Sequence, residues 1–172
     1  MAARSDSNPI DNLEVTIKQT NDSPLTITAT VTNKNQHPVA VLKYNSPLDS
    51  LAFKLGLISI TPDGASEPLN WPTIQIRRVW PPRADSFVHL EPGASHSSEI
   101  TVEDRFTSED RIGKKAAVEL KGRWDMVWNK SKDNITEEEL DNTDSNPNVF
   151  NGDYSSNIVE IIGRQKLHED DL

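Results

Sequence analysis

Residues 25–49 decide the fold of this chain, and they read LTITATVTNKNQHPVAVLKYNSPLD. Apolar residues alternate with threonines over residues 25–32, the period of two that gives a β-strand one apolar and one polar face. Polar residues 33–36 break this pattern, and a second apolar run follows at residues 39–44. We therefore predict two antiparallel strands joined by a polar turn. The loop that follows, residues 44–49, is a candidate for contact with a partner.

Short apolar segments recur along the rest of the chain, with proline and glycine between them. The turns at residues 61–64 and 91–93 both combine a proline, which presets φ, with a glycine, which accepts positive φ. Many short strands separated by such turns are typical of a β-sandwich. We predict an all-β sandwich of eight to nine antiparallel strands. The further strand segments are residues 13–17, 53–61, 73–79, 87–90, 100–102, 115–128 and 157–162.

Length and composition fit a single domain. The chain has 172 residues, of which 34% are hydrophobic, so the core is expected to be thin and the loops polar. We place the domain at residues 12–163, with flexible ends at residues 1–11 and 164–172. No cysteine is present, which excludes disulfides, thiolate metal sites and cysteine nucleophiles.

Charge narrows the class of partner. The net charge is −9 and the pI is near 4.9, which argues against a nucleic acid or an anionic membrane surface and leaves a protein partner. No apolar block follows the polar amino-terminal residues 1–15, which predicts a cytoplasmic protein, or a secreted one if a signal was removed. Three sequons, at Asn21, Asn129 and Asn134, would be glycosylated only in a secreted chain.

The sequence carries no recognisable catalytic constellation. HExxH, GxSxG and phosphate-binding glycine loops are all missing from it. His89 and His96 flank a turn, where solvated histidines are the ordinary interpretation and a metal site the alternative. We therefore expect no enzyme, no metal and no cofactor.

Two further segments are candidates for partner contact. Residues 130–153 form a predicted long acidic loop, since residues 133–153 hold seven acidic residues and no basic one. This loop is either a solvated flexible insertion or a set of carboxylates offered to a cationic or metal-bearing surface. Trp80 precedes Pro-Pro-Arg, the composition of an interface anchor, with a locally packed turn as the alternative. The candidate partner-binding residues are Tyr44, Ser46, Leu48, Asp49, Trp80, Arg83, Glu137, Glu138 and Glu139.

Three motifs in order carry a family resemblance: TATVTNKNQHPVAVLKYNSPLD, FVHLEPGAS and YSSNIVEI. Together they resemble the pro-region that precedes deuterolysin-type fungal metallopeptidases, the aspzincins, and the likeness extends over residues 13–162. It implies an immunoglobulin-like sandwich. The HExxH of the peptidase itself is missing here, so the resemblance implies a freestanding domain that binds and inhibits such a peptidase. The alternative is an immunoglobulin-like binding or adaptor module unrelated to proteases.

Overall fold

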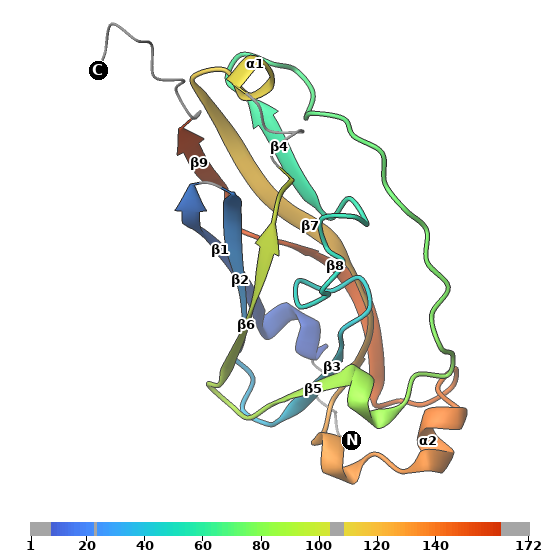
Figure 1. Ribbon diagram of the computed structural model, residues 1–172. Coiled ribbons are helices and arrows are strands. Elements are labelled where there is room, and N and C mark those ends of the chain that lie inside the picture. The colour runs from blue at the N-terminus through green and yellow to red at the C-terminus, as the bar shows by residue number, and fades with distance from the viewer. Residues whose placement is uncertain (1–7, 23, 104–108, 163–172) are drawn as a thin grey trace, which may run out of the picture.

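Two antiparallel sheets make up the molecule. The computed structural model describes residues 8–22, 24–103 and 109–162. One sheet has three strands in the order β1 (Leu13–Asp22), β2 (Leu25–Asn33) and β6 (Ser95–Thr101), and it lies against a larger second sheet (Figure 1). The prediction of an all-β fold is therefore confirmed.

The second sheet is built around the long strand β7 (Lys115–Trp128). The first half of β7 pairs with β4 (Ile58–Pro62) and β9 (Val159–Ile162), and the second half pairs with β3 (Val39–Leu42) and β8 (Val149–Ser155). β5 (Phe87–Leu90) pairs with the other side of β3. Because four strands share β7, this strand joins the two ends of the sheet.

The alternation in residues 25–32 gives β2 its two faces. Ile27, Ala29 and Val31 are fully buried between the sheets. On the opposite face the Thr30 hydroxyl lies 2.8 Å from the Ser97 hydroxyl of β6, so the threonine face bonds across to the neighbouring strand. The predicted apolar and threonine faces of this strand are both present.

β3 is buried on both faces, which explains its uninterrupted apolar sequence. Val39 and Val41 face the main core, whereas Ala40 and Leu42 face a second, smaller cluster. That cluster lies on the outer side of the second sheet, where the short helix α2 (Glu137–Asp141) covers it. Its buried members are Ala40, Leu42, Phe87, Met126, Trp128 and Leu140.

Two predicted strands differ from the structure. Within residues 53–61 only β4 is a strand, because residues 50–56 form successive turns that bury Phe53. Residues 73–79 pair with no strand of the described chain and run as an extended segment on the surface. Both segments have strand-like sequences, but neither lies over its full length along another strand with which its backbone could form a continuous ladder of hydrogen bonds.

The prediction that residues 130–153 form one irregular acidic loop is also wrong. Residues 130–153 contain the 3-10 helix Lys132–Asn134, α2 and most of β8. Elsewhere the structure adds a 3-10 helix, Ala84–Ser86, and the single turn α1 (Glu109–Ile112).

The amino-terminal end is ordered further than predicted. Asn8 caps the 3-10 helix Pro9–Asn12 and Pro9 is buried, so residues 8–11 belong to the fold. The rest of the predicted flexible ends, residues 1–7 and 164–172, lies outside the described residues.

Candidate functional site

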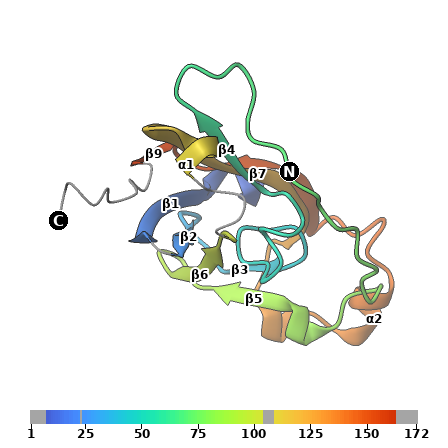
Figure 2. The same ribbon diagram turned by 45° about the horizontal axis from the view of Figure 1, so that its top comes forward.

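A long connection on the surface is the most distinctive feature of the molecule. Residues 63–83, called the strap below, link β4 to the 3-10 helix before β5 and contain no helix or strand. The strap leaves the end of β4 and runs down the outside of the molecule to the α2 end (Figures 1 and 2). Its position is set by contacts near both ends.

The first set of contacts fastens the strap to the turns at residues 50–56. Trp71 is buried, with its ring centroid 5.3 Å from that of Phe53. The backbone N–H of Ile74 donates to the carbonyl of Lys54 at 2.9 Å. Gly56 has a φ of 78° and lies so close to Thr73 that a Cβ there would be 2.8 Å from a methyl carbon. Glycine at position 56 therefore serves both the turn and the close approach of the strap.

The second set is centred on Arg78. Its Nη2 donates to Asp49 Oδ2 at 2.5 Å, and its guanidinium lies 4.8 Å from the centroid of the Tyr44 ring. The Tyr44 hydroxyl donates in turn to the carbonyl of Val79 at 3.2 Å. Ionic, cation–π and hydrogen-bond contacts thus hold the strap against the loop 44–49.

Three side chains of the loop 44–49 point into the molecule. Asp49 is 3% exposed and accepts the backbone N–H groups of Asn45 at 2.8 Å and Leu51 at 2.9 Å. Ser46 is fully buried and accepts the N–H of Leu48, which is buried as well. The prediction that Ser46, Leu48 and Asp49 contact a partner is therefore wrong for this conformation, because these side chains offer no surface. They shape the loop that anchors Arg78.

The exposed face of the strap is apolar and cationic. Of the six large hydrophobic side chains that are exposed in the described part of the chain, four belong to the strap. Residues 68–84 contain three arginines and no acidic residue. We call the following set the strap surface: Ile74 (43% exposed), Ile76 (44%), Val79 (66%) and Trp80 (56%), together with the exposed Arg77.

Sequence reasoning found Trp80 but missed the rest of the strap surface. Residues 73–79 alternate in hydrophobicity, a pattern that predicts a strand. The neighbouring Trp-Pro and Trp-Pro-Pro sequences were the available signal, because proline interrupts sheet pairing on both sides of the segment.

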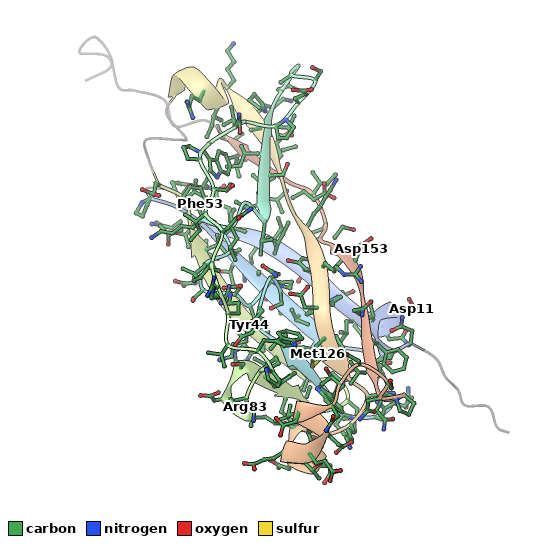
Figure 3. All side chains as sticks on the ribbon, turned by 90° about the vertical axis from the view of Figure 1, so that its right-hand side faces the viewer. Asp11, Tyr44, Phe53, Arg83, Met126 and Asp153 are labelled. Atoms are coloured by element: carbon green, nitrogen blue, oxygen red, sulfur yellow. The ribbon has the colours of Figure 1, made fainter. Side chains whose placement is uncertain are left out.

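Arg83 lies at the lower end of the strap and donates to Asp141 Oδ1 of α2 at 2.8 Å. Figure 3 shows Tyr44 and Arg83 along one side of the molecule, with Asp11 and Asp153 on the other. The structure therefore brings two of the predicted residues, Tyr44 and Arg83, to one side, and Trp80 directly follows Val79, whose carbonyl accepts from the Tyr44 hydroxyl.

The predicted glutamates of α2 divide into two roles. Thr136 and Glu139 form a capping box, and Lys130 Nζ lies 2.7 and 2.6 Å from the two carboxylate oxygens of Glu139. These bonds, with that of Lys130 foremost, lower the pKa of Glu139 from 4.5 to about 2. Glu137 and Glu138 remain exposed in the first turn, where they favour the helix dipole.

The described residues hold no group of three or more His, Asp or Glu side chains arranged for a metal ion. His89 bonds to Glu91 through Nε2 and approaches Ser131 through Nδ1, so it ties β5 to the segment before α2. No helix in the described ranges is long and apolar enough to span a membrane.

Comparison with known families agrees with this architecture. A family model for the immunoglobulin-like domain matches residues 12–162. The chain belongs to the immunoglobulin-like domain family. This immunoglobulin-like domain is also 31% identical over 157 residues to an uncharacterized secreted protein of Arthroderma benhamiae, a match that covers 87% of this chain and 78% of the relative.

The relative corrects one prediction. It is a secreted protein, which conflicts with the expectation of a cytoplasmic location. The polar amino-terminal residues 1–15 were the basis of that expectation, and they do not outweigh similarity over most of the immunoglobulin-like domain.

Proposed function

We propose that this immunoglobulin-like domain is a non-enzymatic, secreted protein-binding domain whose contact site is the strap surface. The observation that carries the proposal is the exposure of Ile74, Ile76, Val79 and Trp80 on one anchored segment. Exposed apolar side chains gathered on one segment mark interaction sites far more often than scattered ones do. Tryptophan and arginine are also the residues most enriched among energetically dominant contacts.

Anchoring makes the strap suitable for binding. Contacts at Trp71, Ile74, Arg78 and Arg83 hold it in place before any partner arrives. A segment that is already ordered loses less conformational entropy on binding, so more of the contact free energy remains as affinity.

A more specific form of the proposal names the partner as a deuterolysin-type metallopeptidase that the domain restrains. Three observations support it. The motif resemblance is to the pro-region of these enzymes, the relative is secreted, as a partner of a secreted peptidase must be, and the strap is extended. An extended segment is the conformation that pairs with a substrate groove or sheet edge.

The test uses the purified chain, a secreted deuterolysin-type peptidase and a peptide substrate. We expect saturable binding and slowed hydrolysis, with Trp80→Ala weakening binding at least ~10-fold, equivalent to ~1.4 kcal/mol. Val79→Asp should weaken it similarly. Ile158→Asp is the matched control, because Ile158 is equally exposed (65%) but lies just before β9, away from the strap.

Two outcomes separate the general proposal from its specific form. Strap-dependent capture of other secreted proteins, without effect on the peptidase, would remove the peptidase as partner and keep the binding domain. Binding that is equal for Val79→Asp and Ile158→Asp, with both variants folded by circular dichroism, would refute the strap as the contact site.

A further inference from the structure

We infer that the partner contributes an extended, acidic segment that pairs with the strap backbone at Gln75 as an added β-strand. This inference rests on the proposed function and names the chemistry of the partner. It follows from which backbone groups of the strap are used, and from the charges beside them.

The backbone of the strap is bonded to the rest of the molecule at Ile74 and is free at Gln75, within the described residues. The N–H of Ile74 points inward, since it donates to the carbonyl of Lys54. In an extended chain, successive residues direct their N–H and C=O groups to opposite sides. The N–H and C=O of Gln75 therefore point away from Lys54, and they make no hydrogen bond within the described residues. Gln75 presents an open strand edge.

Open edges are normally protected by proline, charge or a covering loop. Here Pro72 precedes the stretch around Gln75 and Pro81 follows it. The residues between the two prolines are long enough to pair with a short strand. Ile74 and Ile76 flank Gln75 and are each nearly half exposed. Their side chains would supply the apolar contacts that accompany backbone pairing in β-augmentation.

Charge complementarity defines the partner as acidic. Arg78 and Arg83 are neutralised by Asp49 and Asp141. Arg77 forms no ion pair within the described residues, and Lys54, also exposed, is hydrogen-bonded through its carbonyl to the strap. Arg77 is thus a cation without an ion pair in the described residues, two positions from Gln75, on a chain whose net charge is −9. A carboxylate of an acidic segment that pairs with Gln75 fits this cation.

The experiment is a selection from a random twelve-residue peptide library displayed on phage, carried out against the full chain. We expect enriched peptides in which Asp or Glu alternates with apolar residues. Gln75→Pro removes the free N–H while leaving Ile74 and Ile76 in place, and proline favours an extended conformation at the residue before it. Gln75→Pro should weaken the selected peptides at least ~10-fold, and Gln75→Ala should not.

Three results would overturn the inference. Peptides that bind Gln75→Pro and Gln75→Ala equally, but lose affinity with Trp80→Ala, would show side-chain contact without backbone pairing and leave the proposed function intact. Enrichment of basic or neutral peptides would refute the acidic partner. A dimer in sedimentation that Gln75→Pro dissociates would identify a second copy of the chain as the occupant instead.

A separate observation points to a modification site. We infer that Asn134 carries an N-linked glycan when the chain passes through a secretory pathway. Asn134 is exposed and its side chain makes no hydrogen bond within the described residues. Asn129, in contrast, has its Oδ1 buried. The third sequon, at Asn21, includes residue 23, which lies outside the described ranges.

The reaction joins Asn134 Nδ2 to the anomeric carbon of a lipid-pyrophosphate-linked oligosaccharide. The bond from that carbon to the pyrophosphate oxygen breaks, Nδ2 loses one proton, and the lipid pyrophosphate leaves. Asn134 ends a 3-10 helix on the surface, so the attached sugar extends into solvent and leaves the fold unchanged.

The test secretes the chain from yeast and compares masses before and after endoglycosidase treatment. Asn134→Gln should remove one glycan, and Thr136→Ser, which keeps both the sequon and the helix cap, should retain it. Asn129→Gln should leave the mass shift unchanged. Recovery of the secreted chain with Asn134 unmodified, or loss of the glycan with Asn129→Gln alone, would contradict this assignment.

Discussion

Arg78 shows how one side chain connects distant parts of this sequence. It joins the strap to Asp49, 29 residues earlier in the chain, and to Tyr44, which lies five residues before Asp49. Asp49 is nearly buried, and a buried carboxylate that loses its cation is left with an uncompensated charge.

Arg78→Ala should therefore destabilise the protein by about 2–3 kcal/mol, somewhat less than a fully buried pair, since Arg78 is itself partly exposed. Urea unfolding measures this change. Arg77→Ala is the matched control, because Arg77 is exposed and should change stability by less than about 0.5 kcal/mol. Trypsin should also cleave the strap faster in Arg78→Ala than in the parent chain. Equal stability of the two variants would show that the ion pair does not anchor the strap.

Tyr154 is a second residue whose environment predicts a measurable effect. Its hydroxyl donates to the carbonyl of Asn45 at 2.8 Å, and burial, together with Asp49 and Asp125, raises its pKa. A raised folded pKa means that the neutral form is favoured, so its contribution is complete below the ordinary value of 10.0 and is lost as pH rises above it. We expect the parent chain to lose more stability above about pH 10 than Tyr154→Phe does, measured by urea unfolding at each pH. Parallel profiles would contradict the burial of a neutral tyrosine.

At the scale of elements, α2 is held by its capping box and by Lys130. The pKa of Glu139 is lowered to about 2, so its stabilising contribution is present above the ordinary value of 4.5 and is lost as pH falls towards 2. Glu139→Gln should flatten the pH dependence of stability in that window, whereas Glu137→Gln, which alters only an exposed carboxylate, should not. Thermal unfolding between about pH 2 and 6 provides the comparison.

Neighbours decide which strand-like segments become strands. Residues 39–42 and 73–79 both have the composition of strands. β3 lies between β5 and β7 and is covered by α2, so all its apolar side chains are buried. The strap pairs with no strand among the described residues, so the same kind of residue remains in solvent there.

At the scale of the whole molecule, local stability should be highest in strands that are paired on both sides and lowest in the unpaired strap. We expect amide hydrogen exchange to be slowest in β2, β3 and residues 116–118 and 127–128 of β7, which are paired on both sides, and fast at Gln75, whose N–H has no partner in the described residues. Exchange followed by mass spectrometry resolves both regions. Strong protection at Gln75 in the free chain would mean that the open edge is already occupied.

By itself, the sequence determined the class of fold. Period-two alternation and turn residues each involve only a few adjacent residues, so both can be recognised without knowing the tertiary contacts. The sequence also singled out Trp80, which is exposed in the structure, from the adjacent residues Pro-Pro-Arg alone. Only the tertiary structure decided that the loop 44–49 points inward, that residues 73–79 stay unpaired and that their apolar side chains form a surface. Those outcomes depend on contacts between groups that are far apart in the sequence, such as Arg78 with Asp49. Contacts of this kind produce no periodic pattern in the sequence, so they cannot be predicted from it.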